Sequence, residues 1–176
     1  MRYVTSSIVM VVLVGALAPA QEGMPVLKYG DGRNDGKQSL GGSGEMIEFT
    51  LPPGSSKVAN LSVHGSRYGP PQPPEESYLV FFLGPDRSRI IHTEMAPYSL
   101  FGRGVEAWVT IPFPEPVEVP ERFWVALDFR AHQRRGVYVS YDTSTGGKHS
   151  RVGLPGMPSA ETKFGGDWMI EAVLGK

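Results

Sequence analysis

The chain of 176 residues contains no cysteine. This absence excludes disulfide bonds, thiolate catalysis, cysteine-ligated zinc, iron–sulfur clusters and lipid attachment through a cysteine. An excess of positive charge is also lacking, because 17 Lys and Arg stand against 18 Asp and Glu, which gives a formal net charge of −1. Binding to nucleic acid through neutralised phosphates is therefore not expected.

Glycine and proline are abundant, with 22 Gly and 16 Pro in the chain. Both residues interrupt helices, so a mainly helical protein is excluded. Hydrophobic residues make up 40% of the sequence, which is enough for one core. We expect a single domain that core burial stabilises without covalent cross-links.

The N-terminus has the layout of a secretory signal peptide over residues 1–20. Arg2 is followed by the apolar run 8–17 and by the small residues of Ala18-Pro19-Ala20. We predict cleavage after Ala20, which makes the protein extracytoplasmic, either periplasmic or secreted, and not integral to a membrane. The alternative is an uncleaved N-terminal anchor, although the run is short for a membrane span.

Residues 21–44 form a Gly-rich segment that we expect to be a loop-rich entry to the domain, and residues 45–176 carry recurrent β patterns. Prolines at 112, 114, 116 and 120 predict an extended connection. No window of 12 or more residues has a helical period. The sequence therefore predicts an all-β fold, a single antiparallel β-sandwich that is jelly-roll-like and has about eight strands. The predicted strands are 45–51, 57–65, 78–83, 89–94, 105–111, 123–129, 137–142 and 168–174.

Catalytic motifs are incomplete, so we expect a protein that is not an enzyme. Gly42-Ser43-Gly44 is followed by Glu45 and lacks the outer glycines of a nucleophile elbow. Gly146-Gly147-Lys148 lacks the first glycine of a phosphate-binding loop, and His149 follows the lysine.

Asp31, Asp35 and Gly36 have the offsets of two acidic ligands and of the glycine of a calcium loop. Arg33 and Gly42 occupy positions where oxygen ligands belong, which excludes an EF-hand site. A looser calcium site could still use Asp31 and Asp35 with backbone carbonyls, and no other cofactor is expected. The alternative is that both aspartates form Asx-turns in a Gly-rich loop.

The candidate ligand-binding residues lie on the predicted polar faces of three strands. If these strands are neighbours, their outer faces combine aromatic rings with carboxylates, a mixture that suits a sugar. The alternative is that the tryptophans are buried under loops and that the aspartates hold backbone at strand ends. The candidates are Trp108, Trp124, Tyr138, Asp128 and Asp142.

Two further polar segments adjoin predicted strands. His64, Ser66, Arg67 and Tyr68 form a cluster at a strand exit, where packing against the following prolines is the simpler interpretation. The loop 130–136 carries three arginines and a histidine. It is either a solvated turn or a contact for an acidic surface or polymer.

Four segments follow one another along most of the chain after residue 28. They are YGDGRNDGKQSLGGSGEMIEF, HGSRYGPPQPP, GVYVSYDTST and GDWMIEAVL. In this order they resemble a bacterial family of extracytoplasmic β-sandwich domains of unknown function. The resemblance implies an exported all-β module, sometimes attached to larger secreted or envelope proteins, and it implies no catalytic residue.

Three functions are consistent with these patterns. The favoured one is a non-catalytic, secreted or envelope-associated binding or accessory module whose ligand is a glycan or an envelope protein. The second is a carboxylate-dependent hydrolase of the cell envelope that uses Asp128 and Asp142 with a histidine. The third is a structural protein-interaction domain that uses an exposed edge strand and the loop 130–136.

Overall fold

The computed structural model describes residues 24–175. The predicted signal peptide and its cleavage site lie outside the described residues. Within the described range, no helix has the length and apolar character needed to cross a membrane.

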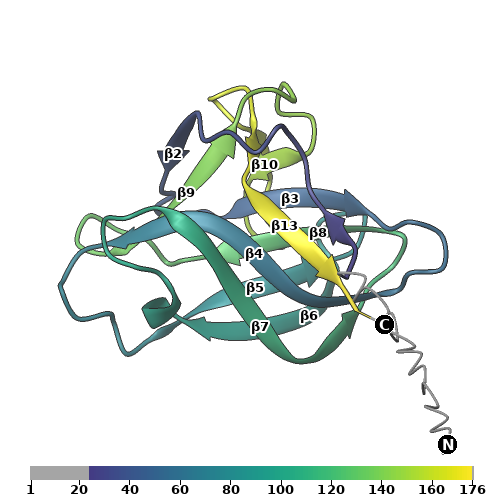
Figure 1. Cartoon of the computed structure of the whole chain (residues 1–176), viewed down its shortest axis with the longest axis horizontal. Coiled ribbons are helices and arrows are strands. Elements are labelled where there is room, and N and C mark those ends of the chain that lie inside the picture. Colours follow the sequence, from purple (N-terminus) through teal and green to yellow (C-terminus); the bar gives the residue numbers. More distant parts are fainter. Residues whose placement is uncertain (1–23, 176) are drawn as a thin grey trace, which may run out of the picture.

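Two antiparallel sheets pack face to face (Figure 1). The first sheet has the order β1 (Val26–Leu27), β13 (Ile170–Leu174), β4 (Lys57–Tyr68), β9 (Gly136–Asp142) and β12 (Asp167–Trp168). In addition, β2 (Gly36–Gln38) pairs with β9, and β7 (Ala107–Glu118) pairs with β4.

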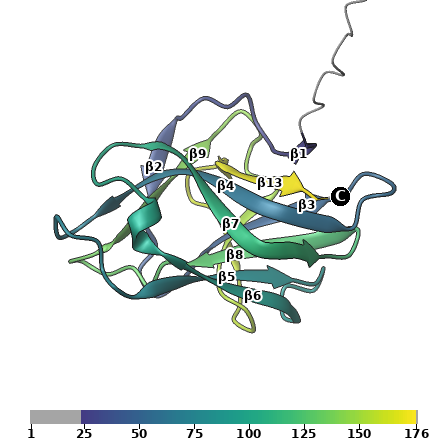
Figure 2. The ribbon, with the colours of Figure 1, turned by 60° about the horizontal axis from the view of Figure 1, so that its bottom comes forward.

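The second sheet has the order β11 (Ala160–Glu161), β10 (Ser150–Val152), β3 (Glu45–Thr50), β8 (Arg122–Asp128), β5 (Ser77–Leu83) and β6 (Ile90–Pro97). A 3-10 turn, Tyr98–Leu100, follows β6. Figure 2 shows β4, β7 and β13 of the first sheet lying over β8, β5 and β6 of the second. The all-β prediction is confirmed, and the two sheets are consistent with a β-sandwich. The jelly-roll topology stays a prediction.

The core lies between the sheets and follows the period-two pattern of the sequence. Alternate side chains of each long strand point inward, which removes their apolar surface from water and stabilises the fold. The large, fully buried side chains include Ile47, Phe49, Leu61, Tyr78, Phe82, Phe123 and Trp168.

Each of the eight predicted segments contains strand structure, but the described residues hold thirteen strands in all. Four short strands, β1, β2, β10 and β11, were not predicted, because two or three residues are too few to show an alternation. Two of them lie in the Gly-rich segment, where Leu27 and Leu40 also pack against the core. The domain boundary at residue 44 stays a prediction.

The prediction of a simple extended connection over the proline-rich segment is wrong. Pro112, Pro114 and Pro116 lie within β7, which pairs only with β4 among the described strands. The register shifts between Val58 and Asn60, so that Pro114 and Pro116 lie in a bulge, while Pro112 stays opposite Asn60 in the ladder. A proline lacks a backbone donor and is tolerated at an edge or a bulge, which explains why the strand continues through them.

Candidate functional site

The five candidate ligand-binding residues do not share one face, because the three strands that carry them are not neighbours in one sheet. Strands β7 and β9 both pair with β4 in the first sheet, whereas β8 lies between β3 and β5 in the second. Trp124 and Asp128 are therefore on a different sheet from Trp108, Tyr138 and Asp142. The alternation of a strand gives its two faces, but it does not say which strands are neighbours.

Trp124 is buried on the outer face of the second sheet and is only 5% exposed. It packs with Met46, Leu83 and Ala126, and the Arg87 guanidinium lies 5.6 Å from its ring centre. Trp124 therefore stabilises a small second core and has little free surface for a ligand.

Asp128 and Asp142 hold backbone at strand ends. Asp128 accepts a hydrogen bond from the Arg130 N–H at 2.9 Å. Asp142 is 2% exposed and accepts from the Gly32 N–H at 2.9 Å and the Ser144 N–H at 2.8 Å. Burial raises the pKa of Asp142, but the hydrogen bonds from Ser144 and Gly32 outweigh it and lower the pKa overall. Asp142 is therefore buried and engaged by backbone donors, whereas Asp128 is half-buried on the other sheet. A hydrolase that uses these two carboxylates stays a prediction.

Asp31 and Asp35 both accept backbone hydrogen bonds. Asp31 accepts from the Arg33 N–H at 2.9 Å, and Asp35 accepts from the N–H and hydroxyl of Thr143 at 2.9 and 2.7 Å. Within residues 24–175, no group of three or more His, Asp or Glu side chains is arranged to hold a metal ion. Calcium binding by this pair stays a prediction.

The outer face of the first sheet brings Trp108 and Tyr138 together with residues that were not predicted as ligands. Tyr138 is opposite Ser66 in the ladder, Trp108 is opposite His64, and Lys37 is opposite Ser140. Side chains that face one another across strands point to the same side of a sheet. We call this surface the outer-face site; its main side chains are Lys37, His64, Tyr68, Glu106, Trp108 and Tyr138.

Trp108 is supported by a polar network at one end of the outer-face site. The residue is 43% exposed, and its ring lies edge-on to His64, with ring centres 5.3 Å apart. The His64 Nδ1 atom is 2.8 Å from the Ser140 hydroxyl oxygen, which fixes the imidazole. Burial lowers the pKa of His64, so the ring is neutral near pH 7, although Glu106 opposes this shift.

The His64–Ser140 contact has the residue types of a nucleophile and its base. Ser140, however, is 0% exposed beneath the sheet surface. The two hollows beside Tyr138, described below, are not lined by Ser140, so this pair positions His64 and does not provide a nucleophile.

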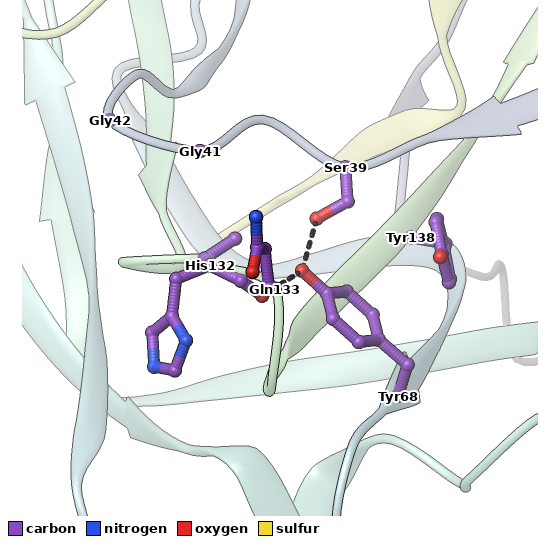
Figure 3. A pocket seen from close by; sticks show the side chains of 8 residues that line it. Ser39, Gly41, Gly42, Tyr68, His132, Gln133 and Tyr138 are labelled. Atoms are coloured by element: carbon purple, nitrogen blue, oxygen red, sulfur yellow. Dashed lines mark hydrogen bonds between the residues drawn. The ribbon is translucent and has the colours of Figure 1, made fainter.

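Tyr68 and Tyr138 form the other end of the outer-face site, with ring centres 4.7 Å apart. The Tyr68 hydroxyl donates to the His132 carbonyl at 2.8 Å and lies 3.3 Å from the Ser39 hydroxyl (Figure 3). An open pocket of about 590 Å³ lies beside them, between the Gly-rich segment and the loop 130–136. Its lining is Ser39, Gly41, Gly42, Tyr68, Ala131, His132, Gln133 and Tyr138.

A second hollow of about 290 Å³ lies against the same two tyrosines. It is lined by Lys37, Ser66, Arg67, Tyr68, Gly69, Arg103, Gly104 and Tyr138. Lys37 forms an ion pair with Glu106, and its ammonium lies 5.3 Å from the Tyr138 ring centre. The Lys37 ammonium also donates a hydrogen bond to Glu106 within this ion pair. That hydrogen bond lowers the pKa of Glu106, which stays ionised at neutral pH.

Some residues of the outer-face site had a signal in the sequence and others did not. His64 and Tyr68 belong to the predicted polar cluster, and His132 to the predicted loop. Arg67 contacts the following prolines through hydrogen bonds, because its guanidinium donates to the Pro70 and Pro71 carbonyls. Glu106 belongs to the predicted strand 105–111, on the same polar face as Trp108. Lys37 had no signal, because it lies in a three-residue strand.

No protein-family model matches the sequence, and no curated protein matches it either. Among solved structures, the chain is similar to that of Cwp84, a surface-layer-associated protein of Clostridium difficile solved with its cysteine protease and lectin-like domains. The TM-score is 0.51 at 13% sequence identity, over 78% of this chain and 33% of the other. The likeness therefore concerns the fold, and this chain spans about a third of that structure.

Proposed function

We propose that this protein is a non-catalytic carbohydrate-binding module of the cell envelope, and that the outer-face site holds the sugar. The observation that carries the proposal is the exposed Trp108 on the same sheet face as the Tyr68–Tyr138 pair, with hydrogen-bonding side chains between them. A lectin-like domain in a structurally similar protein supports it.

Sugar rings have apolar C–H faces and polar edges, so they need flat apolar partners beside hydrogen-bond donors and acceptors. Trp108 and Tyr138 offer the flat surfaces. Glu106, Lys37 and Gln133 lie around them as polar partners.

The spacing of the aromatic side chains fits an extended chain of sugars. Tyr138 on β9 and Trp108 on β7 are separated by β4, so they lie two strand spacings apart. At about 4.8 Å per spacing, this is roughly 10 Å across the sheet. A single monosaccharide cannot cover both rings, which favours an oligosaccharide.

Replacing either aromatic residue tests the proposal. We expect Trp108→Ala and Tyr138→Ala each to weaken binding to a glycan selected on a glycan array by roughly tenfold, because each removes a stacking surface. Isothermal titration calorimetry measures the change. Met95→Ala is the matched control, since Met95 is 72% exposed on the second sheet and should leave binding unchanged.

Two outcomes contradict the proposal. One is the absence of binding to any glycan of a broad array by the folded protein. The other is binding that neither aromatic substitution weakens, which would move the site elsewhere.

We also propose that the module is exported and acts as an accessory to a larger envelope protein. The signal-like N-terminus supports export. The similar structure, in which a lectin-like domain accompanies a protease, supports an accessory role. N-terminal sequencing of the protein recovered outside the cytoplasm should begin at Gln21; an intact Met1 start in the cytoplasmic fraction would refute export.

A further inference from the structure

Positive charge is concentrated at the tyrosine end of the outer-face site. The hollow of about 290 Å³ is lined by Lys37, Arg67 and Arg103, and neither of the two linings there includes an Asp or Glu. The whole chain has a formal net charge of −1, so this concentration is local.

Arg103 is the cation that is open to a ligand. It is exposed, and its Nε–H donates to the Gly69 carbonyl at 2.8 Å. Among the described residues, no carboxylate forms an ion pair with it, whereas Lys37 is already paired with Glu106. A single neutral carbonyl leaves most of the guanidinium fork available for an anion.

The floor of the same hollow has an unused hydrogen-bonding group. Ser66 is 1% exposed, and its hydroxyl has no hydrogen-bond partner among residues 24–175. It lies directly opposite Tyr138 in the ladder and lines the hollow beside Arg103. Buried hydroxyls are usually hydrogen-bonded, so this group points to a polar partner that the protein itself does not supply.

We propose that the outer-face site is specific for acidic glycans, with a sugar ring on Tyr138 and its carboxylate at Arg103. This inference rests on the proposed carbohydrate-binding function. Arginine presents parallel N–H donors that match a carboxylate, and such charge-assisted hydrogen bonds are stronger than neutral ones.

The geometry favours a uronic acid over a nucleic acid. Nucleic acids are held by many cations that follow a phosphate backbone. Here the accessible charge is concentrated at one end of the sheet face, and the Glu106 carboxylate pairs with Lys37 there. A uronate carries its one carboxylate directly on a ring that can stack on tyrosine, which fits this local arrangement.

The test uses glucuronate, galacturonate and mannuronate oligosaccharides, each with its methyl ester of equal length. The ester keeps the sugar and removes the charge. By calorimetry with the full-length protein, we expect at least one acid to bind about tenfold more tightly than its ester. Arg103→Gln should remove that preference, and Arg103→Lys should keep part of it.

Arg122→Gln is the matched control, because Arg122 is an exposed arginine on the second sheet, paired with Glu48. It should leave the preference for the acid intact. Raising the salt concentration should weaken binding of the acid more than binding of its ester.

The outcomes separate the two proposals. Equal binding of acid and ester, unaffected by Arg103→Gln, would overturn the acidic specificity and leave the carbohydrate module standing. No binding of any glycan would overturn the module itself. Equally tight binding of single-stranded DNA would show a general polyanion surface and would also overturn the specificity.

Discussion

Replacing Glu45 by methionine is expected to stabilise the fold at pH 8 by about 2 kcal/mol and to change little at pH 4. Glu45 lies on β3 in the same alternation as Ile47 and Phe49, so its side chain points into the core. It is 1% exposed, and neither carboxyl oxygen has a hydrogen-bond partner among the described residues. Methionine has a similar length and no charge, so it should fill the site without this cost.

The pH dependence follows from the protonation of this carboxyl group. Burial raises the pKa of Glu45 well above its usual value of 4.5, and Asp128 adds to the rise. Nearby backbone N–H groups of Glu45 and Leu40 oppose this only in part. The folded state therefore holds its proton to higher pH than the unfolded state does. The contribution of the Glu45 carboxyl group to the free energy of unfolding is fully present below the unfolded pKa, and it is lost as pH rises toward the folded pKa. Methionine does not titrate, so its advantage grows over the same range.

Urea denaturation at pH 4, 6 and 8 measures the difference between Glu45→Met and the wild type. Glu48→Met is the matched control on the same strand, because Glu48 points outward and pairs with Arg122 at 3.4 Å. A surface ion pair contributes about 0–1 kcal/mol to stability. We therefore expect Glu48→Met to be slightly less stable than the wild type and not more stable. If Glu45→Met changed the free energy of unfolding equally at pH 4 and pH 8, the claim that ionisation of the buried Glu45 carboxyl destabilises the fold would be wrong.

The strands of this fold could be predicted from the sequence because their signal is local. Ile47 and Phe49, or Leu61 and Val63, alternate with polar residues, and each alternation follows from one strand with one face on a core. The same alternation correctly places Trp108 and Tyr138 on outward faces. No knowledge of distant contacts is required for either inference.

The pairing of the strands could not be predicted, because it depends on contacts between distant parts of the chain. Strands β7, β8 and β9 follow one another in sequence, yet β8 crosses to the second sheet and β4 comes to lie between β7 and β9. Trp124, on the outward face of β8, therefore packs in a buried cluster on the second sheet. The outward faces of β7 and β9 meet around His64 and Ser66 instead.

Replacing Asp142 by alanine is expected to destabilise the protein by about 3 kcal/mol at pH 7, because several donors lose one buried acceptor. The carboxylate joins the Gly-rich segment, through the Gly32 N–H, to the loop after β9, through the N–H and hydroxyl of Ser144. Gly30, at a φ of 84°, lies against the carboxylate, where a Cβ atom would collide with it. The Gly-rich segment is therefore built around this one acidic side chain.

The cost of Asp142→Ala should decrease in acid. The pKa of Asp142 is lowered in the folded state, because its hydrogen bonds outweigh the opposing effect of burial. Its stabilising contribution is present above the unfolded pKa of about 3.8 and is lost as pH falls through the folded pKa. Denaturation at pH 7 and pH 3 should therefore give a larger difference from the wild type at pH 7.

Asp35→Ala is the matched control, because Asp35 accepts two hydrogen bonds from Thr143 but lies at the exposed surface. We expect it to cost about 1 kcal/mol or less. Asp142→Ala should also speed amide exchange over Gly36–Gln38, since β2 is continuous with the segment that Asp142 holds. Because β2 carries Lys37 to the outer-face site, glycan binding should weaken with it. A variant that keeps wild-type exchange over β2 and loses less than about 1 kcal/mol would show that the segment is held by other contacts.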